Sequence, residues 1–201
     1  MVWMIQVSLR APVTRIITPL CRALLGMGIT ANAMTVIGAL GTSASSFLLI
    51  ARGHLFAGCL VSAVFVLTDL FDGTMARLSK TGGSAWGALL DSTMDRISDG
   101  AILGALIIWL LKSHDQLIPV IAVALAAGQL VSYIKARAES LDIECNGGIA
   151  ERTERLIIAL VAIGFAGLGV SYILAIGFWL LALLSVFTVG QRLLIVYRAT
   201  R

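Results

Sequence analysis

The stretch TDLFDGTMARLSKTGGSAWGALLDSTMDRISDG, residues 68–100, places five aspartates in a chain of 201 residues that is 59% hydrophobic. They are Asp69, Asp72, Asp91, Asp95 and Asp99. An aspartate at the middle of a membrane helix costs about 2.5 to 3.5 kcal/mol, so five of them need polar surroundings. The stretch therefore predicts two helices that turn their carboxylates toward a common polar site.

The composition around this stretch is that of a membrane protein. Only 13% of the residues are charged and the mean hydropathy is +0.97, whereas a soluble domain carries about 25% charged residues. A membrane-spanning helix needs roughly 20 mostly apolar residues. We therefore expect one transmembrane domain covering residues 1–201, surrounded by membrane lipid and without a nucleic-acid partner.

Apolar runs separated by polar breaks predict an all-α integral membrane protein with six transmembrane helices. Thr30 and Asn32 are possible caps of the first helix, and the Gly-rich turn KTGGS ends the second. The expected spans are residues 30–51, 55–80, 84–111, 117–138, 153–169 and 171–197.

Residues 10–28 predict an N-terminal amphipathic juxtamembrane helix. Arg15 and Arg22 are seven residues apart and share one helical face, which favours a helix lying in the headgroup plane. The alternative is an extension of the first span. Pro19 and Gly26 argue against it, because they interrupt the segment.

The basic residues predict the orientation in the membrane. On the six-span map, Arg52 and Lys112 lie on one side and the other thirteen of the fifteen Lys and Arg lie on the opposite side. By the positive-inside rule, both termini and the aspartates are cytoplasmic. We expect a multi-pass protein of the cell (plasma) membrane.

The aspartates are spaced so that each pair shares a helical face. Asp69 and Asp72 differ in direction by about 60°, and Asp91 and Asp95 by about 40°. Both pairs lie near the cytoplasmic ends of consecutive antiparallel helices, so four carboxylates can converge.

Like charges at such short range need a counter-charge. Two Mg²⁺ or Mn²⁺ ions bridged by carboxylates fit this ligand set, because hard divalent cations prefer oxygen ligands. Pairing with Arg77 and Arg96, or a proton relay, are the alternatives.

Eight positions of the stretch form a recognisable signature. The pattern D-x2-D-G-x2-A-R-x9-G-x3-D-x3-D resembles that of the CDP-alcohol phosphotransferases, membrane enzymes of phospholipid synthesis. Its residues are Asp69, Asp72, Gly73, Ala76, Arg77, Gly87, Asp91 and Asp95. The gap before Gly87 is one residue longer than is usual in that family, and the extra residue falls in the KTGGS turn.

The resemblance implies six spanning helices, usually in a homodimer, that transfer a group from a CDP-linked donor to an alcohol and release CMP. It implies two divalent metals held by Asp69, Asp72, Asp91 and Asp95, and it makes Asp95 the general base as well. It also implies that CDP-diacylglycerol is bound by Asp69, Asp72, Gly73, Ala76 and Arg77.

A second polar group lies in the C-terminal half. Lys135, Arg155 and Arg192 come from three predicted helices at one membrane depth. They can form an anion pocket, because phosphate accepts bidentate contacts from arginine. Structural ion pairing with Glu139, Glu151 and Glu154 is the open alternative.

Two segments here narrow the resemblance. SYIKARAE (132–139) and ERTERLI (151–157) resemble those of the bacterial phosphatidylinositol phosphate synthases. This implies that inositol phosphate is bound by Ser132, Lys135, Arg152, Arg155 and Arg192.

The expected activity is therefore transfer of the phosphatidyl group from CDP-diacylglycerol to inositol phosphate. A phosphatidylglycerophosphate synthase of the same family is the nearest alternative. A cation-coupled transporter is a more distant one, because transporters more typically show interrupted helices in two matching halves. A structural scaffold would have no need of four converging carboxylates.

Overall fold

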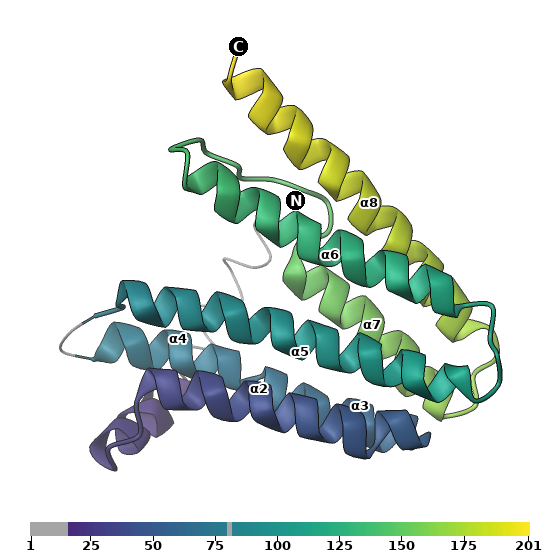
Figure 1. Cartoon of the computed structure of the whole chain (residues 1–201). Coiled ribbons are helices and arrows are strands. Elements are labelled where there is room, and N and C mark those ends of the chain that lie inside the picture. The colour runs from purple at the N-terminus through teal and green to yellow at the C-terminus, as the bar shows by residue number, and fades with distance from the viewer. Residues whose placement is uncertain (1–15, 80–81) are drawn as a thin grey trace. The chain divides into compact units, whose positions relative to one another are not determined.

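The computed structural model describes residues 16–79 and 82–201, and every regular element in these two ranges is a helix. A short helix, Ile16–Gly26, comes first. It is followed by α2 (Ala31–Leu48), the 3-10 turn η1 (Ile50–Arg52), α3 (Leu55–Val66), α4 (Thr68–Leu78), α5 (Ala85–Leu111), α6 (Ile118–Glu139), α7 (Arg152–Gly167) and α8 (Ile173–Ala199) (Figure 1). The all-α prediction is confirmed for these residues.

Contacts among the described residues gather in two compact units. Unit 1 contains the residues up to Ala44 together with Ser62–Ser98, and unit 2 contains Ser45–Val61 and Asp99–Arg201. The helices α2, α3 and α5 each contribute residues to both units. Neither unit is one continuous stretch of chain, and the single transmembrane domain stays a prediction.

In unit 1, α2 packs closely on the end of α3 and the start of α4. A Cβ atom added at Gly38 would collide with the hydroxyl of Thr68, and one added at Gly41 would collide with the ring of Phe65. Small residues of this kind let membrane helices approach each other closely. A single non-helical residue, Leu67, separates α3 from α4, so the polar stretch begins in a new helix.

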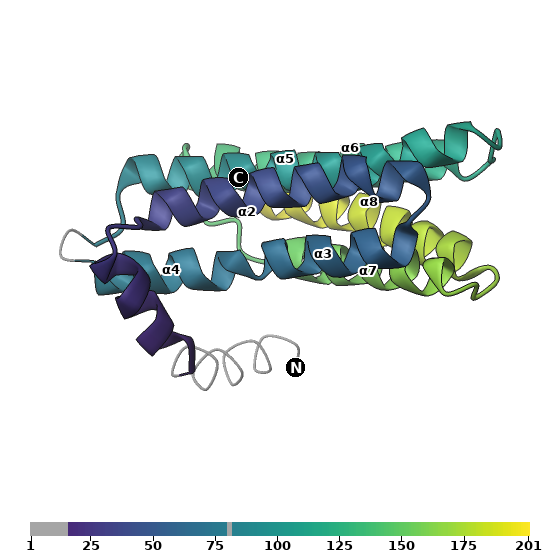
Figure 2. The ribbon, with the colours of Figure 1, turned by 90° about the horizontal axis from the view of Figure 1, so that it is seen from below.

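The helix Ile16–Gly26 lies at the same end of unit 1 as the start of α5 (Figure 2). Cys21 is fully buried, and its thiol donates to a backbone carbonyl of α4 at 3.8 Å. Burial raises the pKa of the Cys21 thiol, as expected of a structural cysteine. Leu20 and Arg22 are exposed. The amphipathic juxtamembrane helix stays a prediction, and Arg15 lies outside the described residues.

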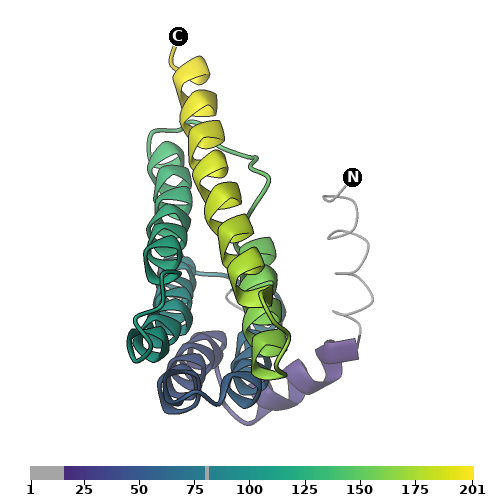
Figure 3. The same ribbon diagram turned by 90° about the vertical axis from the view of Figure 1, so that its right-hand side faces the viewer.

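In unit 2, α8 packs against both α6 and α7, and it runs beside them in Figures 1 and 3. A Cβ atom at Gly177 of α8 would lie 2.5 Å from the Cβ of Ala162 in α7. A Cβ atom at Gly164 of α7 would lie 3.2 Å from the sulfur of Cys59 in α3. These close approaches fix the helices that carry the basic residues.

Four helical segments among the described residues are long and apolar enough to cross a membrane: Ala31–Arg52, Leu55–Leu78, Ile118–Glu139 and Ile173–Ala199. They agree with four of the expected spans to within two residues at each end. The second of them is the pair α3 and α4 rather than one helix.

The other two expected spans, 84–111 and 153–169, also form helices, α5 and α7. The first 15 residues of α5 include four charged residues, which lower its hydropathy. The 16 residues of α7 are about 24 Å long, against about 30 Å of hydrocarbon core. The six-span topology therefore stays a prediction.

Candidate active site

Three of the predicted metal ligands meet in unit 1. Asp69 and Asp72 lie on α4 and Asp91 lies on α5, and each offers an oxygen within 4.8 Å of the others. Asp72 is buried, Asp91 is half-buried and Asp69 is exposed. The structure therefore brings carboxylates of two consecutive helices together, as their spacing predicts.

The arrangement of these oxygens fits a hard divalent cation. Mg²⁺ and Ca²⁺ hold oxygen ligands at about 2.0 to 2.6 Å, so two ligands of one ion lie about 3 to 5 Å apart. A buried carboxylate beside two others is stable when a positive charge is present. The donor set therefore fits Mg²⁺ or Mn²⁺.

Thr35 of α2 orients the most buried of these acids. Its hydroxyl lies 2.6 Å from Oδ2 of Asp72 and donates a hydrogen bond to it. This contact fixes the rotation of the carboxylate. The sequence analysis missed Thr35, because its partner lies 37 positions away in an otherwise apolar context.

Asp95 lies outside the group of three carboxylates. It is one turn beyond Asp91 on α5, and its Oδ2 lies 3.7 Å from Nη2 of Arg96. Its side chain is 19% exposed, so solvent and ligands can reach it. The roles of Asp95 as a metal ligand and as the general base stay predictions.

A pocket of about 750 Å³ adjoins the carboxylates within unit 1. It is lined by residues of α2, α4 and α5 and of the turn between α4 and α5, among them Thr30, Asn32, Thr35, Asp72, Gly73, Ala76, Gly82, Gly83, Gly87 and Asp91. Three of the five predicted donor-binding residues, Asp72, Gly73 and Ala76, line it. Asp69 and Arg77 are not among the lining residues.

Two glycines of the signature, Gly73 and Gly87, leave space along the pocket. A Cβ atom at Gly87 would lie 3.1 Å from Oδ1 of Asn32, so α2 and α5 approach each other closely at this glycine. A Cβ atom at Gly73 would meet nothing closer than 3.8 Å, and it would occupy the pocket instead. Thr30 caps α2, because its hydroxyl accepts a hydrogen bond from the amide of Ala33 at 3.2 Å.

A second candidate site lies in unit 2, around one turn of α6. Arg155 of α7 and Arg192 of α8 are 6% and 3% exposed. A Cβ atom added at Gly128 would lie 3.3 Å from Nε of Arg155. Nη1 of Arg192 donates a hydrogen bond to the carbonyl of Val131 at 2.6 Å. The hydroxyl of Ser132 donates to the Gly128 carbonyl at 3.4 Å. Three of the five predicted acceptor ligands, Ser132, Arg155 and Arg192, thus lie at one turn of α6.

Several of these cations contact acids or backbone carbonyls. Nζ of Lys135 lies 3.9 Å from Glu139, and Nη2 of Arg192 lies 3.6 Å from Glu151. Both pairs belong to the ion-pairing alternative raised by the sequence. Binding of phosphate by these residues stays a prediction.

The connection between α6 and α7 is fastened to α8 at three successive points. The hydroxyl of Thr188 accepts from the amide of Ala150 at 3.2 Å, and Oε1 of Gln191 accepts from the amide of Ile149 at 3.1 Å. Nε of Arg192 donates to the carbonyl of Gly147 at 3.0 Å. We call residues 147–150 the strap.

The signature and the carboxylate geometry agree with a comparison against known families. Residues 28–191 match the family described as CDP-alcohol phosphatidyltransferase. This chain belongs to the CDP-alcohol phosphatidyltransferase family. The matched residues include α4 and α5, which carry the signature. They also include Ser132, Lys135, Arg152 and Arg155, and they end one residue before Arg192.

Relatives with assigned names match most of this chain. It is 41% identical to the phosphatidylinositol phosphate synthase of Corynebacterium glutamicum over 187 residues, which are 92% of this chain and 85% of that protein. It is 43% identical to the enzyme of the same name from Streptomyces avermitilis over 199 residues, 94% and 81% of the two chains.

Solved structures of one relative share the fold. The crystal structure of Mycobacterium tuberculosis phosphatidylinositol phosphate synthase with CDP-DAG bound matches with a TM-score of 0.86 and 42% identity, over 91% of this chain and 94% of that chain. The same enzyme in complex with manganese and citrate matches with a TM-score of 0.84 and 42% identity, over 90% and 88% of the two chains.

Proposed function

We propose that this chain transfers the phosphatidyl group from CDP-diacylglycerol to inositol phosphate and releases CMP. The observation that carries the proposal is the group of Asp69, Asp72 and Asp91 at the edge of a pocket of about 750 Å³. The names of the relatives, and the CDP-DAG bound to one of them, support the choice of donor and acceptor.

The donor is held in the pocket of unit 1. Asp69, Asp72, Asp91 and Asp95 would hold two Mg²⁺ or Mn²⁺ ions. When bound, these ions neutralise the diphosphate and the charge that develops at phosphorus. Gly73 and Ala76 line the pocket with little side-chain bulk, so the backbone of α4 is open to the nucleotide, and Arg77 adds positive charge one turn further along.

The acceptor is held through its phosphate by Ser132, Lys135, Arg152, Arg155 and Arg192. Asp95 accepts the proton of the inositol hydroxyl. The hydroxyl oxygen forms a bond to the phosphorus that carries diacylglycerol, and the bond from that phosphorus to the bridging oxygen breaks. CMP leaves with this oxygen, and phosphatidylinositol phosphate remains.

This chemistry is set in a homodimer of six-span chains in the plasma membrane, with both termini and the active site facing the cytoplasm. The distribution of basic residues, thirteen on one side against two on the other, supports the orientation. The four apolar helices support the membrane setting. Chemical crosslinking of the purified protein would detect the dimer.

The proposal is tested by CMP release from CDP-diacylglycerol. The full-length protein in detergent with Mg²⁺ is offered inositol phosphate, free inositol or glycerol phosphate. We expect rapid release with inositol phosphate only. Rapid release with glycerol phosphate alone would make the chain a phosphatidylglycerophosphate synthase, and no release with any alcohol would refute the proposed reaction.

A further inference from the structure

Asp99 is an acid of the opening stretch that the family signature does not include. It lies on α5 one turn beyond Asp95, and its Oδ1 is 3.4 Å from Nε of Arg152 at the start of α7. The two side chains are only 18% and 19% exposed. The pair therefore joins α5 to α7 in largely shielded surroundings within unit 2.

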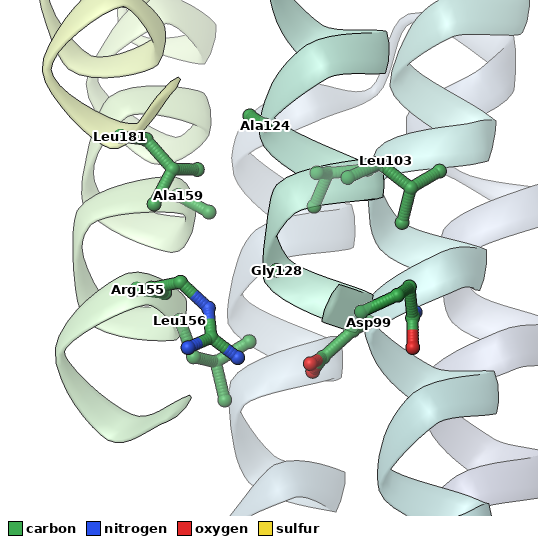
Figure 4. Close-up of a pocket in the computed structure, with 10 residues that line it drawn as sticks. Asp99, Leu103, Ala124, Gly128, Arg155, Leu156, Ala159 and Leu181 are labelled. Carbon is green, nitrogen blue, oxygen red and sulfur yellow. The ribbon is translucent and has the colours of Figure 1, made fainter. Parts of the chain in front are cut away.

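The same carboxylate borders a small cavity. The cavity has a volume of about 30 Å³ and lies among α5, α6, α7 and α8. Asp99, Gln129 and Arg155 form its polar wall, and leucines, alanines and one glycine form the rest. Figure 4 shows Asp99 and Arg155 facing one another across it. A space of this size with three polar neighbours suits about one water molecule.

Asp99 thus faces two guanidinium groups that are three positions apart on α7. Arg152 and Arg155 point from neighbouring turns toward one region, and their charges repel each other unless an anion lies nearby. Asp99 supplies that anion. The contact joins Oδ1 of Asp99 to Nε of Arg152. A planar guanidinium whose orientation is fixed in this way can recognise a phosphate in a bidentate manner.

We propose that Asp99 is a positioning residue for the acceptor's phosphate: it orients Arg152 through Nε and offsets the combined charge of Arg152 and Arg155. The inference rests on the proposed function, because it assumes that these arginines bind a phosphorylated alcohol. It gives a role to an acid that the metal site does not use.

The test compares Asp99→Asn with the wild-type full-length enzyme. The change keeps the shape of the side chain and removes its charge. We expect KM for inositol phosphate to rise about 10-fold, about the effect of losing one charge-assisted hydrogen bond to the ligand. KM for CDP-diacylglycerol and the Mg²⁺ requirement should change less than about 2-fold, since both belong to the other site. Asp142→Asn, an exposed carboxylate in the α6–α7 connection, is the matched control and should leave both KM values unchanged.

A merely structural role for Asp99 predicts a different set of results. In that case the melting temperature falls and both KM values rise together, which would overturn the proposal, as would an unchanged KM for inositol phosphate. A wild-type enzyme without turnover on inositol phosphate would refute the proposed function itself, and this outcome is seen before any variant is made.

A double variant decides the case if Asp99→Asn alone is too unstable to assay. Asp99→Asn combined with Arg152→Gln replaces the ion pair by two amides that can hydrogen-bond. Because Asp99 acts through Arg152, the double variant should have nearly the same KM for inositol phosphate as Arg152→Gln alone. A further rise of 10-fold in the double variant would show that Asp99 acts elsewhere and would overturn the proposal.

Discussion

At the scale of single residues, the hydrogen bond from Thr35 to Asp72 (2.6 Å) gives the sharpest test of the metal site. Thr35→Val keeps the shape of the side chain and removes the donor, so the Asp72 carboxylate is free to rotate. We expect the dissociation constant of Mn²⁺ to rise about 10-fold, measured by titration calorimetry on metal-free protein. Thr35→Ser keeps the hydroxyl and should bind nearly as tightly as wild type.

Thr93→Val is the control for this experiment. The Thr93 hydroxyl is exposed and donates only to a backbone carbonyl one turn back, at 2.7 Å. It lies between Asp91 and Asp95 in the sequence but points to the other side of α5. Equal Mn²⁺ affinity in the Thr35→Val variant and the wild type would refute the orienting role.

The role of Asp95 is tested by measuring turnover and donor binding separately. Asp95→Asn removes the proton acceptor and leaves the three clustered carboxylates in place. CMP release should fall by about 10² to 10⁴, while binding of CDP-diacylglycerol, measured by calorimetry, is largely kept. Near-normal turnover would remove Asp95 from the reaction.

The sequence anticipated the residues whose partners follow from helical spacing and missed those with distant partners. Asp69, Asp72 and Asp91 could be placed together, because one short turn brings consecutive helices side by side. Neither Thr35 nor Asp99 carries such a signal. Their contacts cross 37 and 53 positions of chain, and they depend on how the helices pack.

At the scale of helices, close packing at glycine predicts where a methyl group is harmful. Gly38→Ala would drive a Cβ atom into the hydroxyl of Thr68 and to 3.2 Å from the Phe65 carbonyl. Overpacking of this kind costs typically about 1 to 3 kcal/mol, so we expect a melting temperature several degrees lower. Thermal unfolding in detergent measures it.

Gly104→Ala is the matched change in an open position. A Cβ atom there meets nothing within 4 Å, and alanine favours a helix by about 1 kcal/mol over glycine. The melting temperature should therefore stay the same or rise. If both variants melt at the same temperature, the close approach of α2 to α4 does not hold in solution.

Helix positions were predictable from the sequence, whereas the division of one helix was not. Polar breaks and glycines mark the ends of the apolar runs, and these signals place the boundaries within a few residues. The interruption at Leu67 has no proline or glycine beside it. There the Thr68 hydroxyl lies 2.6 Å from the Phe65 carbonyl, a side-chain contact that only the folded chain reveals.

At the scale of the whole molecule, the unsettled prediction is that α5 and α7 also cross the membrane. Their charged residues and short length set them apart from the four apolar helices. Composition alone cannot assign them, because their polar faces can be covered by other helices or by substrate rather than by lipid.

Single cysteines in a cysteine-free variant test this topology. If all six helices span, an impermeant maleimide should label Ser113→Cys and Ser171→Cys on intact cells. Ser84→Cys and Ser140→Cys should react only after the membrane is permeabilised; all four positions are exposed. Labelling of Ser84→Cys and Ser113→Cys from the same side would show that α5 does not cross the membrane.

The strap also limits where the chain can be cut or lengthened. A protease draws its target into an extended strand away from the protein, and an inserted epitope needs similar freedom. Here the backbone of residues 147–150 would first have to give up its three bonds to α8. Gly147 and Gly148 also have φ values of 129° and 133°, which other residues rarely adopt. Tags are therefore better joined at the exposed C-terminal residues Thr200 and Arg201.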